Sequence, residues 1–163
     1  MPIPVIAVIA AIDAVSAVKA AVDKVTKATA DGDFARSVIL IVENHLSVPL
    51  EKIHENHEHG GWYVDPSGTI PPKSVVVFSS RSNGVATGTA GLVEYAIRDK
   101  KPEDSVLQIE WNNPFVGSNK ADAFAWANGG HSPHKASSLY HASKSIGTGD
   151  KQVQMRYSLL PRV

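Results

Sequence analysis

The stretch Ser37-Val38-Ile39-Leu40-Ile41-Val42 decides the fold class of this chain. Its unbroken row of mostly β-branched residues is typical of a buried strand. Directly before it, Ala30-Asp31-Gly32-Asp33 has the composition that ends helices. The chain therefore changes from helix to strand at this point.

Downstream of this strand the chain reads as predominantly β. Five further runs have strand character and alternate with turn clusters rich in Gly, Pro, Asn and Asp; they lie at 74–78, 88–98, 105–111, 138–145 and 153–160. Segments 51–59 and 120–128 are each compatible with a short helix. We therefore expect a mainly β protein, an antiparallel β-sandwich over 36–163.

Upstream of the strand, residues 3–30 follow a helical period. Apolar side chains recur every three or four positions, at Val5, Val8, Ile12, Val15, Val18 and Val22. The pattern predicts an amphipathic N-terminal helix within residues 1–32, packed on the sandwich of one domain, 1–163. At about 1.5 Å per residue this helix would reach about 40 Å, enough to cross a bilayer core of about 30 Å. Because a basic start is missing and Asp13 interrupts the apolar run, we expect this segment to be retained rather than cleaved as a signal peptide.

Composition excludes several classes of function. The 163 residues carry a formal net charge of +0, which argues against a nucleic-acid partner. With Cys at 0, thiol nucleophiles and Cys-type zinc sites are absent. The chain also lacks a Gly-x-Ser-x-Gly elbow and a glycine-rich phosphate loop before a helix. We therefore expect a protein that is not an enzyme and that needs no cofactor.

A histidine cluster is the main candidate for metal chemistry. His54, His57 and His59 lie within six residues, and three imidazoles are able to bind a transition metal. The spacing differs from the His-Glu-x-x-His pattern of metalloproteases. The cluster is predicted to be a solvated loop without metal, and a metal-binding protein is kept as an alternative.

A loop with two aromatic residues is the best candidate for a binding site. Trp111 and Phe115 lie on either side of Asn113-Pro114, at the end of a predicted strand. Such rings are typical of insertion at a membrane headgroup interface. Packing of both rings into the core is the alternative, and the same two interpretations apply to Trp126.

The order of these features resembles the actinoporins, the pore-forming cytolysins of sea anemones, and their fungal and moss relatives. The similarity covers nearly the whole chain in order. Four segments carry it: Val42-Glu43-Asn44, Ile70-Pro71-Pro72-Lys73, the Val-Ala-Thr-Gly-x-x-Gly motif at 85–91, and the Pro-aromatic loop closed by Ser-Asn at 113–119. The aegerolysins are also similar around this loop but lack the N-terminal helix. The short loop and the lack of Cys are more similar to fungal members than to anemone toxins.

The resemblance implies a secreted, membrane-active protein that binds lipid headgroups, including phosphocholine or sphingolipid. It implies that copies assemble on a target host membrane and insert the N-terminal helix to form a pore. Some fungal proteins of this kind elicit hypersensitive cell death in host plants. The headgroup-binding set implied here is Trp111, Asn112, Pro114, Phe115, Ser118, Trp126 and Tyr140.

Departures from the family pattern keep other functions open. The tyrosine-rich second helix of the family has no clear counterpart, and Asn112 stands where the family has Ser. One alternative is a binding module of the same fold that forms no pore, either lectin-like or sensed as an elicitor by a host surface receptor. In that case the helix would be a permanent part of the core.

Overall fold

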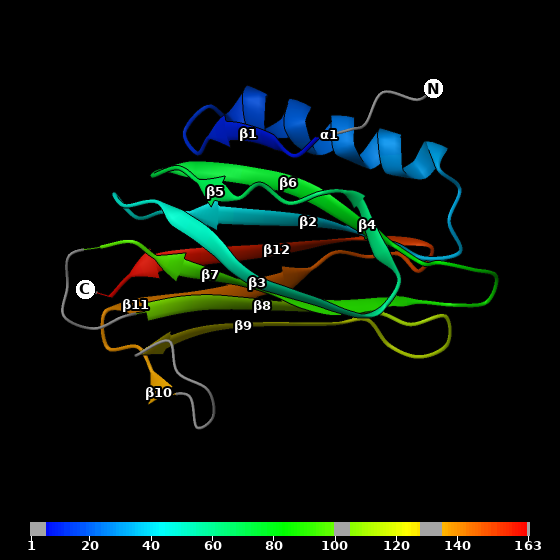
Figure 1. Ribbon diagram of the computed structural model, residues 1–163. Coiled ribbons are helices and arrows are strands. Elements are labelled where there is room, and N and C mark those ends of the chain that lie inside the picture. The colour runs from blue at the N-terminus through cyan, green and yellow to red at the C-terminus, as the bar shows by residue number, and fades with distance from the viewer. Residues whose placement is uncertain (1–5, 100–104, 128–134, 163) are drawn as a thin grey trace.

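Twelve strands and one helix make up the described residues 6–99, 105–127 and 135–162 of the computed structural model (Figure 1). In chain order these elements are β1 (Val8–Ala11), α1 (Val15–Asp31), β2 (Ser37–Asn44), β3 (Leu50–His59), β4 (Gly61–Val64), β5 (Thr69–Ile70), β6 (Ser74–Arg81), β7 (Thr89–Ile97), β8 (Ser105–Asn113), β9 (Lys120–Ala127), β10 (Lys135–Ala136), β11 (Tyr140–Ile146) and β12 (Gln152–Pro161).

The strands form two sheets that pack face to face. One sheet has the order β1-β6-β2-β12-β11, with β4 also paired to β6, and we call it the helix-side sheet because α1 lies on its outer face (Figure 1). The second sheet has the order β10-β9-β8-β7-β3-β5. The named strand pairs are antiparallel except β2 and β12, which run parallel. The predicted sandwich with one packed helix is confirmed.

The apolar run of β2 is continuous because both of its faces are covered. Residues 37–42 are all buried. Ile39 lies opposite Ser79 of β6, and the Ser79 hydroxyl is hydrogen-bonded to Thr29 of α1, so these positions face the helix. The alternate residues of β2 face the second sheet, since successive side chains of a strand point to opposite faces. The six runs predicted as strands all become strands.

The predicted N-terminal helix is wrong in its first half. Val8 lies in β1, Ile12 lies in the turn after it, and α1 begins at Val15, while Val5 lies outside the described residues. The helix has 17 residues and is therefore about 26 Å long. Among the described residues no helix is long and apolar enough to cross a membrane.

β1 is a strand because it completes an edge of the helix-side sheet. Val8 to Ala11 pair in register with Val77 to Ser74 of β6. The backbone amide of Ile12 donates to the carbonyl of Lys73, which extends this pairing into the turn. Helical and strand patterns are not distinguishable in a short apolar run of Val, Ile and Ala. Pairing with β6 therefore overrides the local helical period.

The two short helices considered for 51–59 and 120–128 are also wrong. The first segment lies in β3, and most of the second forms β9. The predicted loop around His54, His57 and His59 is likewise a strand. Two register shifts, between Lys52 and His54 and between His57 and His59, break the alternation along β3.

Candidate functional site

Four connecting segments meet at one end of the sandwich, on the right in Figure 1. They are segment 32–36 after α1, the β6–β7 loop at 82–88, the β8–β9 loop at 114–119 and the β11–β12 turn at 147–151. We call this region the loop end. It contains the Pro-aromatic loop that sequence analysis identified.

The amide side chains of two asparagines hold these loops together. The side-chain amide of Asn113 donates to the carbonyls of Ser37 and Asp150, at 3.1 and 2.9 Å. Asn119 donates to the carbonyl of Gly149 at 2.9 Å. The β8–β9 loop is therefore tied both to β2 and to the β11–β12 turn, which fixes the position of its tip.

The glycines of the Val-Ala-Thr-Gly-x-x-Gly motif permit close packing at this end. A Cβ atom on Gly88 would lie 2.6 Å from the carbonyl oxygen of Asn113. A Cβ atom on Gly91 would lie 2.8 Å from the ring of Trp111, its cross-strand partner. The motif thus lets the β6–β7 connection and β7 approach β8 closely.

Apolar side chains are exposed at the tips of the loop end. Val85 is 95% exposed on the β6–β7 loop, and Val116 and Phe115 are 84% and 40% exposed on the β8–β9 loop. The guanidinium group of Arg36 lies 4.6 Å from the Phe115 ring centre and donates to the carbonyls of Phe115 and Pro114. These contacts place a cation directly beside an exposed aromatic ring.

A depression of about 530 Å³ lies beside these tips. Phe34 and Arg81 line it, with the Arg81 guanidinium group 5.5 Å from the Phe34 ring centre. Lys151 and Asp33 also line it and form an ion pair of 2.6 Å. The hydrogen bond and the positive charge of Lys151 lower the pKa of Asp33. The depression therefore presents both signs of charge next to an aromatic ring.

Trp111 does not belong to this exposed set, and its predicted membrane contact is wrong. Its side chain is 2% exposed, and its ring packs at 5.1 Å from Trp62 and 5.2 Å from His57. The indole Nε1 donates to the hydroxyl of Thr89 at 3.2 Å. The ring fills the space left by Gly91, so Trp111 belongs to the core, as the alternative interpretation held.

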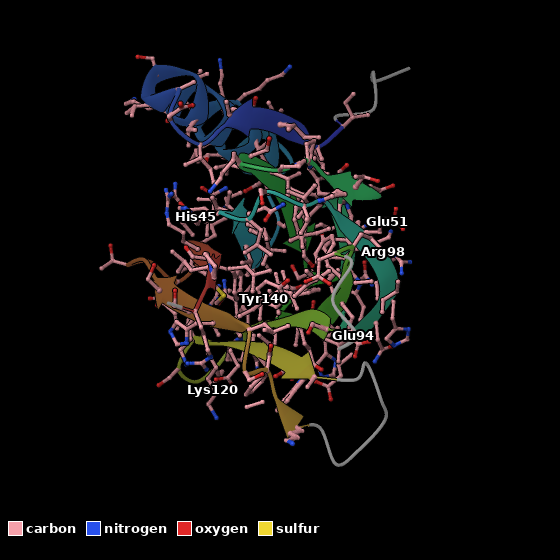
Figure 2. All side chains as sticks on the ribbon, turned by 90° about the vertical axis from the view of Figure 1, so that its left-hand side faces the viewer. His45, Glu51, Glu94, Arg98, Lys120 and Tyr140 are labelled. Atoms are coloured by element: carbon pink, nitrogen blue, oxygen red, sulfur yellow. The ribbon has the colours of Figure 1, made fainter. Side chains whose placement is uncertain are left out.

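The other predicted headgroup residues lie in three different places. Pro114, Phe115 and Ser118 lie on the β8–β9 loop, with Asn112 at the end of β8 just before it. Trp126 lies on β9, stacked on Phe124 at 4.9 Å between ring centres. Tyr140 is buried at the start of β11, at the opposite end of the sandwich (Figure 2). The predicted set therefore does not form one site.

The histidine cluster does not converge either. His54 pairs with Glu94 and His57 with Gly91, on opposite faces of β3, and His57 points inward to the hydroxyl of Ser80 at 2.9 Å. In the described part of the chain, no group of three His, Cys, Asp or Glu side chains is placed to hold a metal ion. The three imidazoles are therefore not arranged as a shared metal site.

Sequence reasoning missed Val85, Val116, Arg36 and the Phe34 depression. Val85 and Val116 were parts of quoted motifs, and valine next to Gly or Pro in a turn is a usable signal for an exposed apolar tip. The roles of Phe34 and Arg36 depend on contacts with residues far away in sequence. No local pattern reveals such contacts.

No protein-family model matches this chain. Among curated proteins, an uncharacterized protein of Dictyostelium discoideum is 29% identical over 86 residues, which are 52% of this chain and 8% of that protein. Among solved structures, Nakanori, described as a lipid binding protein, is similar with a TM-score of 0.73 and 17% identity, over 86% of this chain and 78% of that one. At this identity the likeness shows the fold. It covers most of both chains.

Proposed function

We propose that this chain is a membrane-lipid binding protein, not an enzyme, that docks on lipid through its loop end. The observation that carries the proposal is the exposure of Val85, Phe115 and Val116 on two neighbouring loops. Large exposed apolar side chains gathered at one place mark an interaction surface. Arg36 beside Phe115 adds a cation at the level where lipid phosphates lie.

The depression beside the tips supplies a site for a zwitterionic headgroup. Arg81 and Lys151 attract a phosphate, while the Phe34 ring and Asp33 attract a quaternary ammonium group. This arrangement supports phosphocholine lipids, sphingolipid included, as the ligand class. Nakanori, which shares the fold, is described as a lipid binding protein, and this agrees with the proposal.

The resemblance to actinoporins extends the proposal to a secreted protein that acts on a host cell membrane. Copies gathered on the membrane would oligomerise, and the N-terminal segment would be the part that inserts to form a pore. Such a protein would act as a fungal-type elicitor of host-plant cell death. A helix of about 26 Å is shorter than a bilayer core of about 30 Å, so β1 would have to join the inserting segment.

Liposome co-sedimentation with a double variant tests the docking surface. Val85→Ser with Val116→Ser removes about two buried carbons per site, about 1.6 kcal/mol each if fully inserted, at ~0.8 kcal/mol per carbon. The expected loss is about 100-fold in affinity for phosphatidylcholine–sphingomyelin vesicles. Ile53→Ser is the matched control, because Ile53 is 49% exposed on β3, outside both the loop end and the N-terminal segment. It should bind like the wild type.

Two outcomes would contradict the proposal. If the double variant sediments with vesicles as the wild type does, while keeping its circular dichroism spectrum, the loop end is not the docking surface. If the wild type does not bind phosphatidylcholine–sphingomyelin vesicles, the proposal of lipid binding is itself wrong. Binding by a receptor then becomes the better explanation of the exposed tips.

Pore formation by the N-terminal segment needs a separate test. Ala11 and Ser74 are opposite residues of β1 and β6, and such pairs lie about 4.5–5.5 Å apart between Cα atoms, within disulfide range. Ala11→Cys with Ser74→Cys creates the only disulfide of a chain whose Cys count is 0. The oxidised form should bind vesicles without leaking dye, and reduction should restore leakage. Equal leakage by both forms would refute insertion and favour the fixed binding module, in which the helix stays in the core.

A further inference from the structure

The outer face of the second sheet carries a polar and aromatic surface that lies apart from the loop end. Side chains at alternate positions of β8 and β9 point away from the core, since Leu107, Ile109 and Ala125 between them are buried. Among the described residues, seven of these outward side chains remain partly or fully exposed, and the five farther from the β8–β9 loop are Gln108, Glu110, Asp122, Phe124 and Trp126. We call this set the outer patch.

Two aromatic rings form one side of the outer patch. Phe124 and Trp126 stack with 4.9 Å between ring centres and 14° between planes. Both side chains remain partly exposed and form an apolar wall on this face of the sheet. Asp122 lies two residues before Phe124 on the same face of β9, and Glu110 is its cross-strand partner.

A chain of hydrogen bonds orients the polar side. The indole Nε1 of Trp126 donates to the side-chain oxygen of Gln108 at 3.2 Å, and Gln108 is in turn hydrogen-bonded to Glu110. Burial and the charges of Asp122 and Glu58 raise the pKa of Glu110, whereas the bond from Gln108 opposes this rise. Lys144 pairs with Asp122 at 3.1 Å. The carboxylate acceptors are thus held in position before any ligand arrives.

A depression of about 170 Å³ lies further along the same two strands, lined by Glu58, Glu110, Asn112, Lys120 and Asp122. Phe124 and Trp126 do not line it, and Phe124 is two residues beyond Asp122 on β9. The depression is smaller than the ~300–1,000 Å³ of drug-sized ligand sites, so it suits one small cyclic unit of a longer molecule. Its carboxylates repel anions such as lipid phosphate. They accept hydrogen bonds from hydroxyl groups, while Asn112 and Lys120 donate them.

We propose that the outer patch binds a neutral glycan. One sugar ring lies in the depression, where its hydroxyl groups donate to Glu110 and Asp122, and the next ring of the glycan packs its apolar C–H face on Phe124. A neutral polyhydroxylated ligand matches each feature of the patch. Its apolar C–H face packs on the aromatic wall, its hydroxyl groups donate to the preoriented carboxylates, and it carries no negative charge that these carboxylates would repel. The depression borders the β8–β9 loop at Asn112 and Lys120, but none of the outer-patch residues belongs to the loop end.

NMR titration with defined sugars tests this site. The probes are lactose, cellobiose, chitobiose and mannobiose, with sialyllactose as the anionic comparison. The signals are the indole N–H of Trp126 and the side-chain amide of Gln108. At least one neutral disaccharide at about 10 mM should shift both signals, since sites of this size bind with Kd near 1 mM, and sialyllactose should bind more weakly than lactose.

Variants assign the shifts to the outer patch. Phe124→Ala and Glu110→Gln should each weaken sugar binding about tenfold or more, whereas Ile53→Ala, an exposed apolar position on β3, should not. If Phe124→Ala does not fold, Glu110→Gln still tests the site, because it changes only the charge of a surface side chain. Vesicles carrying a neutral glycosphingolipid show whether the glycan also binds when it is anchored to a membrane.

The glycan site is wrong if none of the neutral sugars shifts the two signals, or if the shifts survive both variants. Phosphatidylcholine–sphingomyelin vesicles keep the two proposals apart. Phe124→Ala should bind them as the wild type does, whatever the sugars show. Failure of the lipid proposal would leave the sugar titration unchanged.

Discussion

Replacing Trp111 with Ala should destabilise the whole sandwich. The side chain is 2% exposed and packs against Trp62 and His57, at 5.1 and 5.2 Å between ring centres. Truncating a buried aromatic ring of this kind costs about 3–5 kcal/mol in the free energy of unfolding. For a chain of this length each kcal/mol corresponds to about 2–4 °C. The melting temperature should therefore fall by about 10–15 °C.

Two comparison variants separate the contributions to this loss. Trp111→Phe keeps most of the ring but loses the hydrogen bond to Thr89, and a single hydrogen bond contributes about 1 kcal/mol. Phe115→Ala removes a ring that is 40% exposed. Its main loss is the contact with Arg36, about 0.5–1 kcal/mol.

Urea unfolding followed by far-ultraviolet circular dichroism is the suitable assay, because tryptophan fluorescence changes with the substitution itself. The order of stability should be wild type, Phe115→Ala, Trp111→Phe and Trp111→Ala. Vesicle binding by the folded fraction should be weakened by Phe115→Ala and not by Trp111→Phe. If Trp111→Ala unfolds within about 1 kcal/mol of the wild type, the packing described for this ring is wrong.

Two further predictions concern buried polar side chains. Burial lowers the pKa of His57, the positive charge of Arg81 lowers it further, and the negative charge of Glu55 opposes the shift. As pH falls, the unfolded chain therefore protonates this imidazole before the folded chain does. The free energy of unfolding should fall as pH drops below about 6.5. His57→Gln should flatten this fall in urea unfolding between about pH 7.5 and pH 5.5, and an unchanged slope would contradict the assignment. The Asn44 side chain makes the equivalent of three hydrogen bonds: its two amide protons are shared among the carbonyls of Val48, Ile70 and Pro71, and its oxygen accepts from the backbone amide of Leu46. Asn44→Ala should cost about 3 kcal/mol at ~1 kcal/mol per bond, and thermal unfolding within 2–3 °C of the wild type would show that water replaces the amide.

The sequence predicts best those elements in which burial leaves an unbroken pattern. β2 and β6 are covered on both faces, so their apolar runs are continuous. Their first residues are predicted correctly, and the strands run two and three residues beyond the predicted ends. β3 is mostly exposed and carries two register shifts. Its alternation is lost, and its charged residues resemble a loop or a short helix.

For the candidate site, the sequence indicates the local loop but not the contacts between distant segments. The sequence points to the β8–β9 loop, whose Phe115 and Val116 are exposed in the structure, but it also places the buried Trp111 on the surface with them. The alternation of Leu107, Ile109 and Trp111 on one face of β8 was a sufficient signal for burial. The outward positions of β8 and β9 are the ones that remain available for ligands. Which loops come together at the loop end depends on Asn113 and on sheet topology, and neither is encoded locally.

The N-terminal segment shows how a strand missed in the sequence changes the mechanism. A continuous helix would need only to lose its contacts with the sheet, mainly those of Ala21, Val22 and Val25. These side chains are small and bury little area per residue. With β1 present, release also breaks four residue pairs with β6. Docking of the loop end does not touch β1, because β1 joins α1 at the opposite end of the sandwich (Figure 1). If the protein forms pores, docking and release are therefore two separate steps, and a variant is able to lose the second while keeping the first.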